Sequence, residues 1–466
     1  MESNECDVKA CIIDEKNDKF VVDPNTTYKR YILLILSCGL CIGSYYVYNT
    51  PAALEVQLKS KLNMSSVEFN MLYAIYSLPN LIAPIIGGIL MDKFGARFLV
   101  YLSSILVTAG HAIFAFGVII ESFPIALLGR GIFGCGGDNL ELSQNIIIVG
   151  WFVGRELSMA FGLNSTFSML GEVSNDIFEP IIIRNTNMNT ALWVGFLVCI
   201  GSFLSAIIVN TMDSRRDKLI GKLKFSERPE SEKFKFKDIK KLNIIFWILL
   251  LNCFTVVSSV YCFEYIASGF FQYRFGYDYV EAGSIMSLTF MIAALFCPFI
   301  GYIVDKIGKR GIFIIVSAIL DAMFHVLCLL SPDSDRPVYP ILFLALLGLS
   351  FSIYGTTFWS IISYTVDPNL YGTAFGTVYA ISNLGLTVFP PFVGYIQDNT
   401  HEGHGYFWVS FLLAILGFVG IVTGTIVYFI DMKNGGILNA SNPFKAKAAF
   451  EAKMGRSQPS FDGLVN

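Results

Sequence analysis

Long apolar runs separated by short polar segments recur along the whole chain. A run of about 18 or more residues with few charges is typical of a membrane-spanning helix, because a helix satisfies its own backbone hydrogen bonds in hydrocarbon. The pattern therefore predicts an all-α membrane protein with 12 transmembrane helices. The predicted helices begin near Tyr31, Met71, Leu99, Phe123, Leu157, Ala191, Ile244, Ala282, Ile312, Tyr339, Ala374 and Tyr406.

A stretch of ten residues occurs twice, each time between two apolar runs. Residues 88–97 read GILMDKFGAR and residues 301–310 read GYIVDKIGKR, with glycine, aspartate, lysine, glycine and arginine in register. A repeat at matched places in two hydropathy patterns predicts two pseudo-symmetric six-helix bundles. The expected divisions are a cytosolic N-terminal tail (1–29), an N-terminal bundle (30–211), a basic cytosolic linker (212–242), a C-terminal bundle (243–430) and a cytosolic C-terminal tail (431–466).

The distribution of lysine and arginine predicts the orientation in the membrane. Most of the 33 basic residues fall in the two tails and the even-numbered loops, so these segments should be cytosolic by the positive-inside rule. A composition of 54% hydrophobic and 15% charged residues is too apolar for one soluble fold. The net charge of −3 gives no indication of a nucleic-acid partner, and membrane lipid is the expected surrounding.

Patterns typical of enzymes are missing from the sequence. It contains no nucleophile with a base partner, no metal-ligand spacing and no phosphate-binding loop. Cys38 and Cys41 have C-x-x-C spacing, but they fall inside the first predicted span, where packing is the favoured role. We therefore expect a protein that is not an enzyme and that uses no cofactor and no metal.

Charged side chains inside the predicted spans are the candidate functional residues, because a charge at membrane depth must face protein or water. In the fourth span Arg130 is followed by Asp138, Glu141 and Asn145, and at 100° per residue the last three share one face. Glu172 lies on a similar stripe of the fifth span. The acidic excess favours a cationic or amine-bearing ligand, or protons. The alternative is an ion pair between Asp138 and Arg130 that only ties the helix together.

Aromatic and amide side chains in other spans are candidates for the walls of a binding cavity. Tyr45 and Tyr76 lie in the first and second spans, Trp359 in the tenth and Asn383 in the eleventh. Tyrosine and tryptophan also occur as anchors at the membrane interface or as packed core residues, so both roles are open for these positions.

The repeated stretch resembles the motif that follows the second and eighth helices of the major facilitator superfamily. Arg130, Gly134 and Gly136 resemble the fourth-helix motif of that superfamily. Segments 43–54, 71–80 and 128–145 and NLGL at 383–386 resemble, more narrowly, a branch of lysosomal dipeptide transporters. The resemblance implies the major facilitator fold and alternating access. It also implies transport of dipeptides, either by uniport or linked to protons. The expected location is a lysosomal or related endomembrane, with the plasma membrane as the alternative, and the expected partner is a glycosylated accessory membrane protein.

The resemblance also assigns roles to residues. By position, the acidic residue that helps to hold a dipeptide corresponds to Asp138, and a helix-ten tryptophan corresponds to Trp359. An arginine of the fifth helix falls near Met169, where this chain has no cation. A dipeptide site needs an acid for the ammonium, a cation or donors for the carboxylate, and a roomy wall. The predicted substrate-binding residues are Asp138, Glu172, Arg130, Tyr45, Tyr76, Asn145, Trp359 and Asn383.

The two repeated hairpins are expected to act as gates on the cytosolic side. Asp92 and Asp305 would accept hydrogen bonds from helix N-termini of the opposite half, while Arg97 and Arg310 pair with acidic neighbours. Two other functions remain open: a carrier of an organic anion or sugar with the same fold, and a nutrient sensor that does not transport.

Overall fold

The computed structural model describes residues 11–14, 19–22, 28–152, 157–220, 242–366, 371–400 and 405–440. Its membrane part is helical, as the apolar runs predict. The first half of the chain forms α1 (Lys29–Ala53), α2 (Glu55–Leu62), α3 (Ser66–Ser77), the short 3-10 helix η3 (Pro79–Leu81), α4 (Ala83–Phe94), α5 (Ala96–Ile119), α6 (Phe123–Phe152), α7 (Leu157–Asn185) and α8 (Met188–Ile220).

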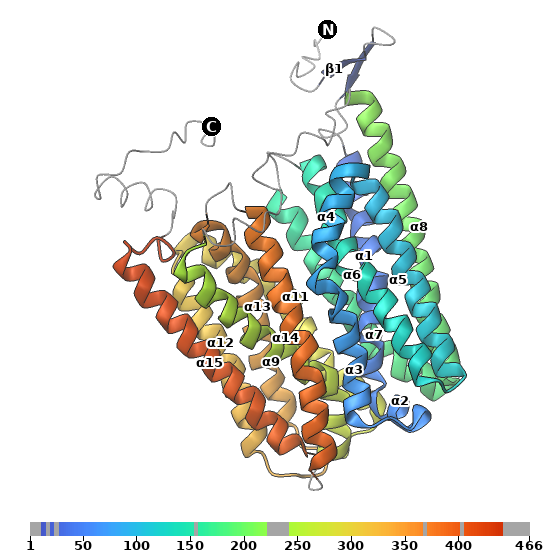
Figure 1. Ribbon diagram of the computed structural model, residues 1–466, viewed down its shortest axis with the longest axis vertical. Helices are drawn as coiled ribbons and strands as arrows, with labels where there is room; N and C mark the ends of the chain where they lie inside the picture. Colours follow the sequence, from blue (N-terminus) through green and yellow to red (C-terminus); the bar gives the residue numbers. More distant parts are fainter. Residues whose placement is uncertain are drawn as a thin grey trace, which may run out of the picture.

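The second half repeats this arrangement. It forms α9 (Ile244–Phe275), α10 (Tyr279–Met286), α11 (Leu288–Ile307), α12 (Arg310–Leu330), α13 (Tyr339–Thr365), α14 (Tyr371–Asn399) and α15 (Tyr406–Lys433). Figure 1 shows α1–α8, in blue to green, and α9–α15, in yellow-green to red, as two bundles side by side. Along the seam α3 packs against α14, α7 against α10 and α11, and α1 against α9.

Not every span is recognisable by hydropathy alone. In the described part of the chain, 8 helices are long and apolar enough to cross a membrane, or 9 if the bent pair Ser66–Leu81 and Ala83–Met91 is one span. Three more helices, α6, α7 and α14, have 30, 29 and 29 residues but carry polar side chains. The structure is therefore consistent with the predicted 12 spans, and five predicted helix starts coincide with the observed ones. These are Phe123, Leu157, Ile244, Tyr339 and Tyr406.

Two segments outside the bundles refine the sequence interpretation. The N-terminal tail contains an antiparallel hairpin, β1 (Cys11–Asp14) with β2 (Lys19–Val22). Helix α8 continues to Ile220, so it enters the segment expected to be linker, while 221–241 lies outside the described residues.

The repeated glycines make the same tight turn in both halves. Gly95, between α4 and α5, has a φ of +89°, and Gly308, between α11 and α12, has a φ of +73°. This region favours glycine, because a side chain would clash with the backbone there. We call the face that contains these two turns the cytosolic side, following the charge prediction, and the face that contains α2 the luminal side (Figure 1).

Candidate functional site

A cavity of about 160 Å³ lies at the seam between the two bundles. Its walls come from α1, α3, α6 and α7 of the first half and from α9 and α14 of the second. The lining residues are Cys41, Ser44, Tyr45, Tyr48, Tyr76, Gly137, Asp138, Glu141, Glu172, Val257, Tyr261, Tyr379, Ser382, Asn383 and Leu386. Five of the predicted binding residues are among them: Asp138, Glu172, Tyr45, Tyr76 and Asn383.

Three carboxyl groups reach this cavity. Asp138 and Glu141 come from α6, where a separation of three residues places them on one face, and Glu172 comes from α7. The Tyr45 hydroxyl donates to Oε2 of Glu141 at 2.8 Å. The sequence places Glu141 on the shared polar face without assigning it to the site, and the structure adds it to the lining.

One hydrogen bond crosses the cavity from one half to the other. Asn383 of α14 donates through Nδ2 to Oδ2 of Asp138 at 2.9 Å. The contact joins residues 245 positions apart, so helix periodicity could not have predicted it. It ties the candidate ligand-binding acid directly to the opposite bundle.

Close packing of α6 against α3 shapes the cavity wall. A Cβ atom at Gly137 would overlap the hydroxyl group of Tyr76, and one at Gly134 would overlap the backbone carbonyl of Tyr76. The glycine-rich segment of the fourth span therefore serves helix packing, as small residues commonly do in membrane helices. The space left by Gly137 lets the Tyr76 ring reach the cavity.

Arg130 has a different role from the predicted one. Its guanidinium donates to the carbonyl oxygens of Leu72, Val47 and Tyr48 at 3.2–3.3 Å, and the residue is 1% exposed. Five aromatic rings surround it, at 5.0–5.9 Å from its central carbon: Tyr48, Tyr73, Tyr76, Phe114 and Phe133. Arg130 therefore ties α6 to α1 and α3. It is not among the residues that line the cavity, and the described residues show no ion pair between Arg130 and Asp138.

Two further predicted binding residues, Asn145 and Trp359, are not among the residues that line the cavity. Asn145 lies one turn beyond Glu141 and accepts a hydrogen bond from Asn164 at 3.4 Å. Trp359 of α13 contacts the Tyr379 ring at a centroid distance of 5.2 Å, and Tyr379 in turn lines the cavity. Trp359 therefore contacts the cavity wall from outside, through the Tyr379 ring.

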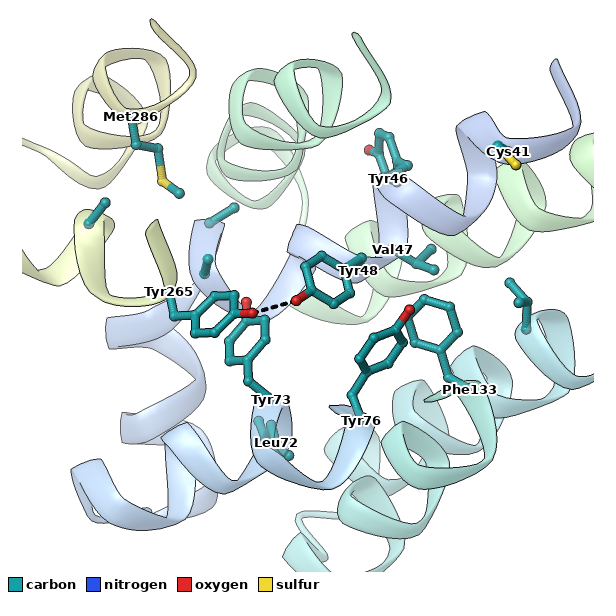
Figure 2. Close-up of a cluster of buried hydrophobic side chains, with 14 of the residues drawn as sticks. Cys41, Tyr46, Val47, Tyr48, Leu72, Tyr73, Tyr76, Phe133, Tyr265 and Met286 are labelled. Atoms are coloured by element: carbon teal, nitrogen blue, oxygen red, sulfur yellow. Dashed lines mark hydrogen bonds between the residues drawn. The ribbon is translucent and has the colours of Figure 1, made fainter. Parts of the chain in front are cut away.

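Tyr48 of α1, Tyr73 of α3 and Tyr265 of α9 form a tyrosine layer next to the cavity, and Figure 2 shows their rings in contact. Tyr48 of α1 and Tyr265 of α9 share a hydrogen bond between their hydroxyl groups at 2.5 Å. The rings of Tyr73 and Tyr265 are stacked, with centroids 3.7 Å apart and an interplanar angle of 8°. These contacts join the two halves one helical turn from the lining residues Tyr45 and Tyr261, toward the luminal side.

Polar contacts between the halves continue at the luminal surface. The carboxylate of Asp398, at the end of α14, accepts from the backbone amides of Ser66 at 2.7 Å and Val67 at 2.9 Å. These amides belong to the first turn of α3, where backbone donors have no partner within the helix. Arg184 and Asp278 form a more exposed ion pair at 3.6 Å between α7 and the start of α10.

Glu55 makes a buried contact between the halves. This residue of α2, outside the spanning helices, accepts from the backbone amide of Gly269 of α9 at 2.9 Å and pairs with Lys59 at 3.3 Å. Burial raises the pKa of the Glu55 carboxyl above its usual value, although Lys59 and the Gly269 amide act in the opposite direction.

The repeated hairpins on the cytosolic side make contacts within their own halves. Arg97 pairs with Asp217 at 3.0 Å and Asp213 at 3.4 Å, both on α8. Arg310 pairs with Asp305 at 3.4 Å and donates to the Ala440 carbonyl at 3.2 Å. The Asp92 side chain lies outside the described residues. Apart from the bond between Asn383 and Asp138, the polar contacts between the halves that the described residues make therefore lie on the luminal side of the cavity.

The chain matches a family model described as Major Facilitator Superfamily over residues 35–390. The chain belongs to the Major Facilitator Superfamily. This match confirms the resemblance seen in the sequence. Together with the apolar helices, it shows that the protein is a multi-pass membrane transporter.

Relatives and solved structures agree with this assignment. The lysosomal dipeptide transporter MFSD1 of Mus musculus is 30% identical to this superfamily member over 431 residues, which is 90% of each chain. The Bos taurus protein of the same name is 29% identical over 447 residues, 94% of this chain and 92% of the relative. The crystal structure of the nucleoside transporter NupG superposes with a TM-score of 0.67 at 13% identity, covering 85% of this chain and 99% of that one. That likeness shows a shared fold.

Proposed function

We propose that this superfamily member transports dipeptides and related small amine-bearing solutes across a lysosomal or related membrane by alternating access. The observation that carries the proposal is a cavity at the seam of the two halves into which three carboxyl groups project, one of them bonded to the opposite half. The names of the MFSD1 relatives support dipeptides as the substrate class.

The ammonium group of the substrate is held by Asp138 and Glu172. A charge-assisted hydrogen bond between an ammonium and a carboxylate is stronger than a neutral one, and more so in a cavity shielded from water. Tyr45 and Tyr76 provide flat, mostly apolar walls with a hydroxyl at the edge, which suits side chains of different size. Asn383 of the second half donates a hydrogen bond to Asp138 of the first. A substrate ammonium that binds Asp138 in place of the Asn383 amide therefore breaks a contact between the halves.

Alternating access follows from the two sets of contacts. The tyrosine layer and Asp398 hold the luminal side closed in this conformation. Opening toward the lumen requires these contacts to break while the cytosolic hairpins, with Asp92, Arg97, Asp305 and Arg310, approach the opposite half. Transport by uniport and proton-linked transport both fit this cycle, and a glycosylated accessory protein stays a prediction from the resemblance.

Counterflow in liposomes tests the proposed function. Purified protein is reconstituted with unlabelled alanyl-alanine inside, and uptake of labelled alanyl-alanine is followed at two pH values on each side. We expect uptake with the wild-type protein and a loss of at least about tenfold in Asp138→Asn, because one charged contact with the ammonium is removed. Glu68→Gln is the matched control, since Glu68 lies in the capping box of α3 outside the cavity.

Uptake of sugars or monocarboxylates in place of dipeptides would contradict the proposal and favour the organic-anion or sugar carrier. Binding of dipeptides without any counterflow would favour the sensor.

A further inference from the structure

The repeated hairpins of the two halves are held in different ways. Arg97 of the first hairpin pairs with Asp213 and Asp217 on α8, the last helix of its half. The last helix of the second half, α15, ends at Lys433, and the chain after it folds back onto the hairpin between α11 and α12. We call residues 434–440 the C-terminal strap. The second half thus uses a backbone segment where the first half uses two carboxylates.

Two glycines and a buried leucine shape the C-terminal strap. Gly435 and Gly436 have φ values of +94° and +66°, a region that favours glycine, so the chain can reverse directly after α15. Leu438 is 2% exposed and belongs to an apolar cluster of the second half. The carboxylate of Asp431, in the last turn of α15, accepts from the Leu438 backbone amide at 3.0 Å and from the Asn439 side chain at 2.8 Å. The C-terminal strap is therefore packed and hydrogen-bonded onto the second bundle.

The C-terminal strap binds the second hairpin at the start of α12. The backbone amides of Lys309 and Arg310 donate to the carbonyl oxygens of Asn439 at 3.0 Å and Leu438 at 3.3 Å. Amides at a helix start have no partner within the helix, so these bonds satisfy free donors. The Arg310 side chain donates to the Ala440 carbonyl at 3.2 Å, and Arg310 is 2% exposed. This arginine is therefore engaged inside its own half.

The proposed transport cycle requires the second hairpin to approach the first half when the protein opens to the lumen. Arg310 cannot contact the first half while it is buried against the C-terminal strap. We propose that the C-terminal strap is a latch, which holds the second hairpin in the luminal-closed conformation and must leave Arg310 before the lumen side can open. The inference rests on the proposed alternating access and adds a controlled step to it.

A charge at Leu438 tests the latch in the full chain. Leu438→Asp expels this side chain from its apolar cluster, whereas Asn434→Asp adds the same charge at an exposed position of the same segment. Spin labels at Lys61→Cys and Asn399→Cys, in a Cys135→Ser background, report how far the halves separate on the luminal side. We expect the luminal-open fraction to rise at least about fivefold in Leu438→Asp and to stay at the wild-type value in Asn434→Asp. A lower melting temperature with unchanged luminal distances would overturn the proposal, because the C-terminal strap would then only stabilise the fold.

A disulfide across the same contact tests whether the C-terminal strap must leave. A Cβ atom at Gly311, in the first turn of α12, would lie 3.3 Å from the Asn439 side chain, so cysteines at both positions are close enough for a bond. The oxidised Gly311→Cys/Asn439→Cys protein should take up labelled alanyl-alanine at least about tenfold more slowly than the same protein after reduction. Asn439→Cys alone is the control and should not depend on reduction. Equal uptake before and after reduction, with the disulfide shown by mass spectrometry, would contradict the latch.

The two measurements separate this inference from the proposed function. The distance measurement needs no substrate, so unchanged distances in folded Leu438→Asp refute the latch whatever the protein transports. Wild-type protein that moves no dipeptide refutes the proposed function and leaves the distance result standing. Gel filtration shows whether each variant folds, and the disulfide experiment decides if Leu438→Asp does not.

Discussion

Replacing Asp398 by asparagine should shift the transport cycle toward the state that is open to the lumen. The Asp398 carboxylate accepts from two backbone amides, those of Ser66 and Val67, at 2.7 and 2.9 Å. It thereby joins the last turn of α14 in one half to the first turn of α3 in the other. Asparagine offers one acceptor oxygen in place of two and carries no charge for the positive end of the α3 dipole.

The size of the shift follows from these contacts. A hydrogen bond to a charged group contributes about 1.5–3 kcal/mol when buried. Asp398 is exposed at the surface, and water screens such contacts, so about 1–2 kcal/mol is expected for the loss of charge and one bond together. A change of about 1.4 kcal/mol alters a two-state equilibrium tenfold, so the luminal-open population should rise between about fivefold and thirtyfold.

Distances between spin labels measure this population. Labels at Lys61→Cys and Asn399→Cys report the separation of the two halves on the luminal side, in a Cys135→Ser background because Cys135 is an exposed cysteine. We expect Asp398→Asn to increase the fraction of long distances. An unchanged distance distribution would refute the assignment of Asp398 as a contact that holds the halves together.

Glu68→Gln is the control for this experiment. Glu68 accepts from the Ser65 amide at 2.9 Å in the capping box of the same helix, so it stabilises the start of α3 without touching the other half. The control should leave the distances as in the wild type. An equal shift in both variants would show that the stability of α3, and not the contact between halves, controls the opening.

Three further predictions concern single side chains. Gly137→Ala should lower transport in the uptake assay at least about tenfold, because the added methyl group displaces the Tyr76 ring from the cavity wall. Gly131→Ala on the same helix is the control: its methyl group would lie 3.6 Å from the Ile75 side chain, an ordinary contact, so this variant should transport normally. Arg130→Lys should reduce the free energy of unfolding by about 2–4 kcal/mol and so lower the melting temperature of the purified protein, because lysine cannot reach three carbonyls in different directions. An unchanged melting temperature would contradict the structural role of Arg130. Burial raises the pKa of Glu55 in the folded protein, so the folded state binds this proton more tightly than the unfolded chain does. The free energy of unfolding should therefore fall as the pH rises above the ordinary carboxyl value of about 4.5, and this part of the pH dependence of melting should vanish in Glu55→Gln.

Local sequence pattern is sufficient for much of the site. The spacing of Asp138 and Glu141 on α6 defines a polar face at 100° per residue, and the structure places that face on the cavity. Glu172 follows the same rule on α7. Such residues are predictable because a polar face in a spanning helix has only protein or water to turn toward.

The role of Arg130 was not predictable in this way. It stands eight residues before Asp138, so both could have met one ligand in a tilted helix. The structure shows three carbonyl partners contributed by α1 and α3. The groups that surround an arginine depend on where the neighbouring helices end and bend, and this cannot be predicted from the sequence of α6 alone. Trp359 is a similar case, because Tyr379 of the adjacent helix occupies the position at the cavity that the tryptophan could have taken.

The sequence by itself determined the helical membrane fold, the repeat that makes two halves and the direction in which the acidic faces point. Only the tertiary structure decided which of those faces meet, because Asn383 and Asp138 are 245 residues apart and Asp398 and Ser66 are 332 apart. Periodicity acts within one helix, whereas a contact between halves depends on the packing of all of them together. That packing placed three carboxyl groups in one cavity and turned the nearby arginine away from it.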